Sequence, residues 1–465
     1  MRTTKRCFLQ FDFYDRTGIQ KYLEKQAEKG WMLEKISAFG WRFRRAEPRK
    51  RHFSVNYFPK ASVFDPEPSE KQQQFQEFCA HTGWQIAATN AQMQIFFNEK
   101  EEPIPIETDA EMEIENIHNA MKKGMMPSWF LLLFCALLQM GLFIGRLSSD
   151  PIGVLASNIN LFTGFCWLLI LFMIVGEAGS YFLWRKKAKR AAELDGSFVT
   201  TKGRNGIRIA VLCLMFAALG LMLVSFGSAA MVWIYMATVV VILGVTALVL
   251  GFSALMKRLK APAATNRVAT IAVTLLLSFG ITGILLVVII NGIMQIFPEK
   301  IPSETYEYKG HSFRVYDDEL PVTVEDLTDV NYDEYSRAWT VEESILLAQF
   351  HAYQRPRMDA LEIPDLKYTI TMVKLPILYD WCLQEMLNSK DNWYSIDIDG
   401  NRSYDVFKVS AAEPWGANAA YQLFHGEETR EIYLICFEKC IVRFEPDWKL
   451  TEEQMRIIGE KLNIK

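Results

Sequence analysis

Five long apolar stretches constrain the fold of this chain more than any other feature of its sequence. They cover residues 127–146, 159–184, 207–226, 229–256 and 268–297. As a helix, each is long enough to cross a hydrocarbon core about 30 Å thick, which takes roughly 20 apolar residues. The sequence therefore predicts a multi-span α-helical protein of the cell membrane, with five transmembrane helices in contact with the lipid bilayer.

The polar flanks of this membrane region are long enough to fold by themselves. We expect a domain over residues 1–98, a connector over 99–126, the membrane region over 127–297 and a second domain over 298–465. Because the predicted number of spans is odd, the two domains should lie on opposite sides of the bilayer.

Basic residues in the short loops indicate the orientation, since Lys and Arg are retained on the cytoplasmic side. They precede the first span and follow the second and fourth: Lys122, Lys123, Arg185, Lys186, Lys187, Lys189, Arg190, Lys257, Arg258 and Lys260. The loop at 147–158 carries Asp150 and no basic residue. We therefore expect a cytoplasmic N-terminus and an extracytoplasmic C-terminus.

The two flanks also differ in charge. Residues 1–100 hold 17 Lys or Arg against 11 Asp or Glu, whereas residues 298–465 hold 18 against 32. A basic inner domain is attracted to an anionic leaflet, and an acidic outer domain attracts cations or basic peptides. Cys382, Cys436 and Cys440 in the acidic flank allow at most one disulfide, and free buried thiols are the alternative.

A repeated pattern organises the N-terminal flank. Gly30-Trp31 and Gly83-Trp84 each follow a stretch with helical apolar spacing and precede a strand-like stretch. Glycine just past a helix end adopts the left-handed cap at little cost. The pattern predicts a small α+β domain, with a ferredoxin-like sheet as one form and both tryptophans as core anchors. A hairpin is expected about Phe39-Gly40.

The residues that carry a family resemblance are Phe8, Phe11-Asp12, Tyr22-Leu23, Ala27, Gly30-Trp31, Leu33, Gly83-Trp84 and Phe96-Phe97. In these residues the chain resembles an uncharacterised family of bacterial membrane proteins, mostly Gram-positive, with an N-terminal domain of unknown function ahead of several spans. Tyr22 departs from that family, where Trp is expected. The resemblance implies a PadR-type transcriptional regulator encoded nearby, and hence a cytoplasmic protein partner, but no catalytic residue.

A basic cluster lies in the predicted inner domain: Arg42, Arg44, Arg45, Arg49, Lys50 and Arg51. Aromatic residues interleave with it, a composition that binds phosphates and stacks bases. The same composition is typical of a solvated hairpin beside a membrane, or of a surface for anionic lipid or an acidic protein. We expect no direct nucleic-acid contact. The connector, capped by Asp109 and helical to Lys123, either transmits motion or is a simple spacer.

Glu177 is the one acidic residue within the predicted spans. An intramembrane carboxylate is a candidate for a proton or cation pathway, although its position near the inner interface also allows a structural role. Gly141 and Gly145, and Gly176 with Ser180, form small-x-x-x-small pairs that can bring helices close within the bundle or in a homo-oligomer.

The predicted outer domain is α+β. We expect a hairpin over 306–316, helices from Thr340 through Phe350 and over 377–388, strands over 368–374, 421–425, 430–437 and 440–444, and a last helix over 451–462. The run from Asp397 to Asp405 lacks the Gly and Glu that an EF-hand requires, so a hairpin at Asp399-Gly400 is the better interpretation.

No nucleotide-binding, zinc or hydrolase motif occurs, and the six His have no metal-ligand spacing. We therefore expect no enzyme, no cofactor and no metal site. Two hypotheses remain for the function. One is a sensory or regulatory protein that couples the outer domain to a cytoplasmic partner of the inner domain, and the alternative is a component of a membrane transport or export system.

Overall fold

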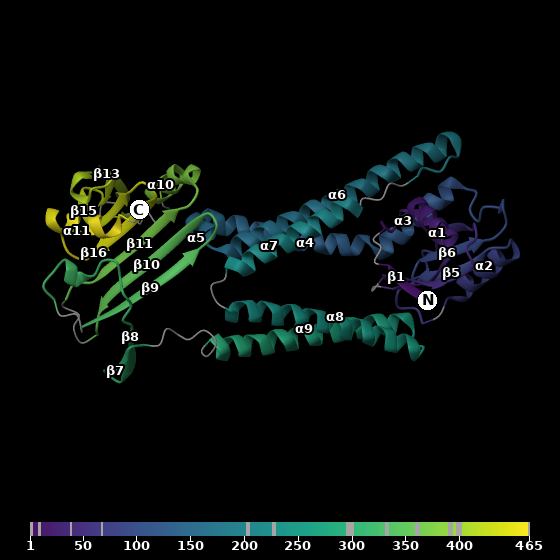
Figure 1. Ribbon diagram of the computed structural model, residues 1–465, viewed down its shortest axis with the longest axis horizontal. Helices are drawn as coiled ribbons and strands as arrows, with labels where there is room; N and C mark the ends of the chain where they lie inside the picture. Colours follow the sequence, from purple (N-terminus) through teal and green to yellow (C-terminus); the bar gives the residue numbers. More distant parts are fainter. Residues whose placement is uncertain are drawn as a thin grey trace. The chain divides into compact units, whose positions relative to one another are not determined.

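The computed structural model describes residues 3–7, 11–37, 40–66, 68–200, 205–225, 229–293, 302–330, 334–358, 363–388, 394–396 and 402–463 (Figure 1). The chain forms two compact units. The N-terminal unit comprises Met1–Gln139, Cys166–Gly220 and Met231–Leu286, and the C-terminal unit comprises Met140–Phe165, Leu221–Ala230 and Val287–Lys465.

The N-terminal unit contains the same β-α-β-β arrangement twice. Its elements are β1 (Thr4–Cys7), α1 (Arg16–Glu28), β2 (Trp31–Ser37), β3 (Gly40–Arg45), β4 (His52–Tyr57), α2 (Glu70–His81), β5 (Gln85–Asn90) and β6 (Met93–Asn98). Both copies form an antiparallel three-stranded sheet with the third strand in the centre, in the orders β1-β3-β2 and β4-β6-β5. A helix followed by Gly-Trp and a strand occurs in each half, and the described residues form two separate sheets in place of one ferredoxin-like sheet. Phe8 and Phe39 lie outside them.

Both helices of the repeat end as predicted. Gly30 and Gly83 have φ of 76° and 92°, in the left-handed region that glycine adopts without strain. Trp84 is 4% exposed and its Nε1 donates to the carbonyl of Ile104 at 2.8 Å. Trp31 is only half-buried, and the Lys5 ammonium lies 4.7 Å from its ring centroid. Trp84 is therefore a core residue, while Trp31 lies at the edge of the core.

The connector helix α3 (Ala110–Gly124) is part of the folded N-terminal unit. Asp109 caps it by accepting from the backbone N–H groups of its first turn. Its inner face buries Ile117, Ala120 and Met121, which join one hydrophobic core with α1 and both sheets. A bare spacer would not bury such a face, so α3 extends the N-terminal domain up to the first span.

All five apolar stretches form helices: α4 (Met126–Ser149), α6 (Asn158–Asp195), α7 (Asn205–Ser225), α8 (Ala229–Arg258) and α9 (Ala263–Ile293). Within the described residues, four are long and apolar enough to span a bilayer: Met126–Ser149, Asn158–Leu194, Met236–Arg258 and Ala263–Gly283. The apolar part of α7, Ile209–Met222, is shorter. Side chains such as Leu183, which is 71% exposed, would be costly in water. The helices thus indicate a membrane protein with at least four candidate spans.

The predicted small-residue pairs do not form close helix contacts here. A Cβ built on Gly141, Gly145 or Gly176 would meet no atom within 4 Å outside its own helix. Glycine is therefore not required by packing at these positions within the described chain.

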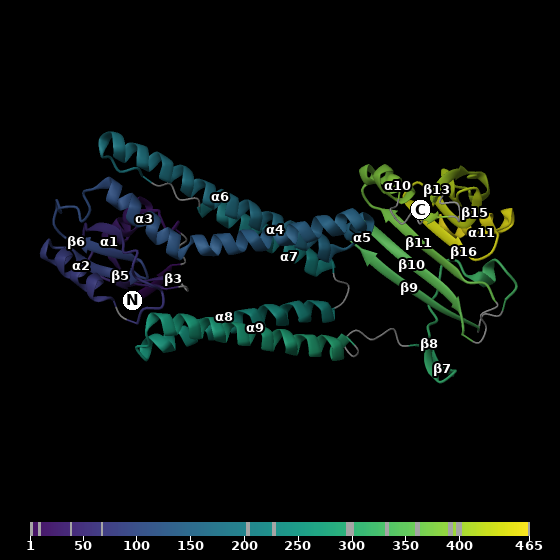
Figure 2. The same ribbon diagram turned by 180° about the vertical axis from the view of Figure 1, so that it is seen from behind.

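The C-terminal unit is β-rich (Figure 2). Its strands are β7 (Glu304–Tyr308), β8 (His311–Val315), β9 (Tyr335–Glu343), β10 (Leu347–Pro356), β11 (Leu366–Val373), β12 (Tyr394–Ile396), β13 (Arg402–Ser410), β14 (Ala419–His425), β15 (Glu428–Cys436) and β16 (Cys440–Pro446). β7 and β8 form a hairpin, and the others form an eight-stranded antiparallel sheet in the order β12-β13-β14-β15-β16-β11-β10-β9.

Helices cover both faces of this sheet. Alternate residues of β15 point to opposite sides, so that Tyr433 and Ile435 join one core while Leu434 and Cys436 join another. The first core is closed by α11 (Glu452–Leu462), which begins with the predicted capping box of Thr451. The second is closed by α10 (Tyr379–Leu387) and by the short α5 (Pro151–Ala156) from the loop after the first span.

One predicted helix is wrong. The segment from Thr340 through Phe350 is the end of β9, a short turn and the start of β10, which pairs along its length with β9 and β11. Helical spacing of three apolar residues is overridden by this pairing on both sides. The Asp399-Gly400 turn lies outside the described residues, although β12 and β13 on either side of it do pair antiparallel. Cys382, Cys436 and Cys440 are buried free thiols.

Candidate functional site

The segment from α4 through α6, residues 126–195, belongs to both units and is the candidate functional element. The division of the chain into units falls within α4, between Gln139 and Met140, and again within α6, between Phe165 and Cys166. α6 is a single continuous helix of 38 residues. The two ends of this α4–α6 segment belong to the N-terminal unit, and its middle, with α5, belongs to the C-terminal unit.

α5 docks the segment onto the C-terminal sheet. Asp150 caps α5 by accepting from the N–H of Gly153 at 2.9 Å, and Pro151 starts the helix at a position that needs no N–H donor. Ile152 and Ala156, 7% and 0% exposed, are buried in the core beneath β10, β11 and α10. The loop between two apolar helices is therefore an integral part of the C-terminal core.

Two polar contacts reinforce this docking. The hydroxyl of Ser344 donates to the carbonyl of Leu155 at 2.6 Å, and the amide of Asn158 donates to the carbonyl of Glu343 at 3.0 Å. Ser344 is 2% exposed, so its hydroxyl would be costly to leave unpaired. The contact ties the turn between β9 and β10 to the first residue of α6.

An aromatic cluster holds both α4 and α6 where they belong to the N-terminal unit. Tyr181 on α6 is fully buried, with ring centroids of Tyr14, Trp129 and Trp184 at 5.2, 6.0 and 6.1 Å. Tyr14 comes from the entrance to α1 and Trp129 from α4. Aromatic pairs at such distances add to the free energy of simple burial. The cluster thus joins both helices to the N-terminal domain.

His118 on α3 completes this cluster. Its Nδ1 lies 2.9 Å from the hydroxyl of Tyr181, and the two rings are nearly parallel. Burial lowers the pKa of His118, and the nearby cations Arg185 and Lys189 lower it further. The neutral imidazole is therefore the favoured form beside Tyr181.

A partly buried ion pair lies next to the aromatic cluster. Arg16 at the start of α1 pairs with Glu113 on α3. Burial raises the pKa of the Glu113 carboxyl, while the Arg16 guanidinium opposes that change. The pair fixes α1 against α3 in the part of the domain that contacts α6.

Glu177 lines a small cavity one turn before Tyr181. The cavity has a volume of about 60 Å³ and is also lined by Asp12, Tyr14 and Ser180. Asp12 is 6% exposed, and the sequence pattern gave no sign that it would meet Glu177. Phe172, Met173 and Ile207 make much of its wall apolar, and the cavity brings the side chains of Asp12 and Glu177 to one space beside α6.

The basic cluster is partly neutralised. Arg42 pairs with Glu34 at 2.9 Å, and both Arg49 and Arg51 pair with Glu99 at 3.3 and 2.9 Å. These guanidiniums lower the pKa of Glu99, with the hydrogen bond from Arg51 as the largest cause. Arg45 lies over the ring of Trp31, its Cζ 5.1 Å from the centroid. Arg44 and Lys50 are exposed, and no ion pair of theirs occurs in the described structure. The cluster is mainly a solvated face.

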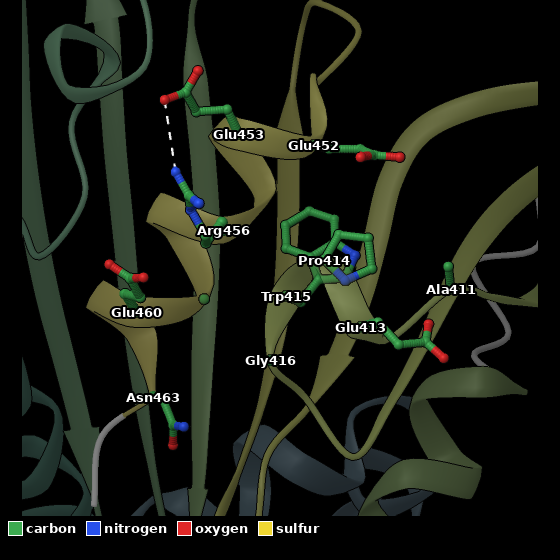
Figure 3. Close-up of a pocket in the computed structure, with 11 residues that line it drawn as sticks. Ala411, Glu413, Pro414, Trp415, Gly416, Glu452, Glu453, Arg456, Glu460 and Asn463 are labelled. Carbon is green, nitrogen blue, oxygen red and sulfur yellow. Dashed lines mark ion pairs between the residues drawn. The ribbon is translucent and has the colours of Figure 1, made fainter.

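A large open cavity lies in the C-terminal unit between α11 and the 3-10 helix η4 (Glu413–Trp415). It has a volume of about 940 Å³, and Figure 3 shows Glu452, Glu453 and Glu460 along its wall with Arg456. The ion pair drawn joins Glu453 and Arg456 at 3.7 Å. The carboxylates are spread over an open surface, and no group of three potential metal ligands occurs among the residues that the structure describes.

Comparison with known protein families gives a match for one part of the chain. Residues 15–129 match the model of a family described as a protein of unknown function, DUF2812. The match begins at the cap of α1 and ends at Trp129, so it includes α3 and the start of α4. This agrees with the expected uncharacterised family with an N-terminal domain of unknown function. No curated protein and no solved structure matches the chain.

Proposed function

We propose that this protein is a membrane-embedded sensor or regulator with no catalytic role. A ligand or stress acting on the C-terminal domain changes how the N-terminal domain engages a cytoplasmic protein. The basic loops support a cytoplasmic N-terminus and an extracytoplasmic C-terminus in the cell membrane. By family resemblance the partner is a PadR-type regulator, and Gly141 with Gly145 offers a contact for homo-oligomers.

One observation carries this proposal: the α4–α6 segment is anchored in both units, through α5 in its middle and through the aromatic cluster near its ends. Ile152 and Ala156 lie in the core of the C-terminal unit, and Tyr181 lies in the core of the N-terminal unit. A continuous helix keeps its backbone hydrogen bonds over its whole length and resists compression, so displacing one end displaces the other. Two cores that share helices in this way can exchange a conformational signal.

The test is to undock α5 and measure the N-terminal unit. Ala156→Glu puts a charge into an apolar core, and Ser344→Ala removes only the hydrogen bonds of one hydroxyl, to Leu155 and within its own turn. In full-length protein in nanodiscs, both variants should change the hydrogen exchange of α3, the first more strongly. Ser149→Glu is the matched control, since that position at the end of α4 is exposed. Changes confined to the C-terminal unit would contradict the coupling.

Transport or export is the second candidate, and the Asp12–Glu177 cavity favours it. Two carboxylates that line one cavity beside an apolar helix suit a proton or cation pathway. Under this function Glu177→Gln fails to complement a deletion of the gene at normal membrane level. If the protein is a sensor, its function is lost when residues 1–98 are removed or when the charges of Arg44 and Arg45 are reversed.

A further inference from the structure

Two loops at one end of the C-terminal sheet expose large apolar side chains. Ile345, between β9 and β10, is 65% exposed, and Leu375 and Ile377, between β11 and α10, are 42% and 87% exposed. The loops are neighbours, because the N–H of Lys374 donates to the carbonyl of Leu346 at 3.0 Å. We call Ile345, Leu375 and Ile377 the apolar loop patch.

The turn that carries Ile345 is held firmly. The Lys374 ammonium donates to the carbonyl of Ser344 at 2.6 Å and pairs with Glu343 at 2.5 Å. The buried hydroxyl of Ser344 accepts from the N–H of Leu346 at 2.9 Å. The exposed isoleucine is therefore displayed by a fixed turn.

The same turn is bonded to the chain where it joins two candidate membrane spans. Ser344 contacts Leu155, and Glu343 contacts Asn158, the first residue of the span Asn158–Leu194. The preceding span ends at Ser149. Residues 150–157 must therefore lie at a bilayer surface. Ile345 directly follows Ser344, which is hydrogen-bonded to Leu155 in this loop.

We propose that the apolar loop patch inserts into the boundary between the headgroups and acyl chains on this side of the bilayer. Apolar side chains bind there in proportion to the apolar area that they bury. Trp381 in the first turn of α10 is 38% exposed, and an indole favours the same interfacial layer. We favour lipid over a protein partner because the turn that carries Ile345 is hydrogen-bonded to the loop between two candidate spans. The contact fixes the depth of the C-terminal domain.

Photo-cross-linking tests this surface in the full-length chain. A benzophenone amino acid replaces Ile345 or Ile377, with the protein in phosphatidylcholine nanodiscs. Glu460 is the matched control, because it is exposed on α11, which covers the opposite face of the sheet. We expect phospholipid adducts several-fold above those at position 460.

Adducts no more frequent than at position 460 would overturn the proposal, as would adducts to a second copy of the chain. A second measurement does not depend on the probe at Ile377. Ile377→Asp places a charge in the patch and should reduce lipid adducts from a probe at Ile345. Unchanged adducts in that variant would also contradict insertion.

Discussion

Replacing Tyr181 with alanine should detach α6 from the N-terminal domain. The side chain is fully buried and contacts the rings of Tyr14 just before α1, Trp129 on α4 and Trp184 on α6. Truncating a buried aromatic residue typically costs about 3–5 kcal/mol. Tyr181→Phe keeps the ring and loses only the hydrogen bond with His118, which is about 1 kcal/mol. The two variants therefore separate ring packing from the hydroxyl contact.

Limited proteolysis of the full-length protein in nanodiscs measures this opening. Where the cleavage rate follows the population of the open form, a loss of about 3 kcal/mol in the free energy of opening raises the cleavage rate of Tyr181→Ala more than a hundredfold. Tyr181→Phe should raise the cleavage rate of the N-terminal domain by less than about tenfold. Leu183→Ala, at a position that is 71% exposed, is the control and should cleave like the unchanged protein. Equal cleavage of Tyr181→Ala and Leu183→Ala would refute the role given to the aromatic cluster.

Three further changes test the two domains in the full-length chain. Trp84→Ala should destabilise the N-terminal domain by about 3–5 kcal/mol, more than Trp31→Ala at the core edge; equal thermal shifts would contradict the difference in burial. Since Arg51 lowers the pKa of Glu99, that carboxylate stabilises the fold above its unfolded pKa and less as pH falls through the lowered pKa. The difference in melting temperature between Glu99→Gln and the unchanged protein should therefore shrink from about pH 6 to about pH 3. A difference that stays constant with pH would contradict this role of Glu99. Gly459→Ala places a Cβ 1.9 Å from a backbone oxygen of η4 and should cost about 1–3 kcal/mol, seen as a lower melting temperature of the C-terminal domain; an unchanged melt would exclude this close approach.

The features that the sequence predicted correctly depend on neighbours along the chain. Apolar stretches, the glycines after α1 and α2 and the capping box at Thr451 each act within a few residues. The error at Thr340 to Phe350 arose where distant pairing decides, because β10 lies between β9 and β11. Local spacing of Ile345 and Phe350 carries no information about those partners.

The candidate site was predictable only in part. Glu177 could be identified because an acidic residue is conspicuous within an apolar helix, whereas Asp12 reaches the same cavity through tertiary folding. α5 had a weak local signal: Asp150-Pro151 is a cap followed by a favourable first helical residue, ahead of apolar side chains. That signal predicts a short helix in the loop but not the sheet on which it docks.

The turn of α6 from Gly176 to Ser180 links the two proposed functions. A Cβ on Gly176 or Gly179 would meet no atom within 4 Å outside the helix, so neither glycine serves close packing there. The hydroxyl of Ser180 donates to the carbonyl of Gly176 at 2.5 Å, and such bonds back onto the preceding turn often bend helices. A helix fixed at both ends should bend most readily at this turn, which also carries Glu177. Motion arriving from α5 would then alter the Asp12–Glu177 cavity in a sensor as well as in a transporter. Loss of function in Glu177→Gln therefore favours transport only if the protein remains active after charge reversal at Arg44 and Arg45, which leaves Asp12 in place.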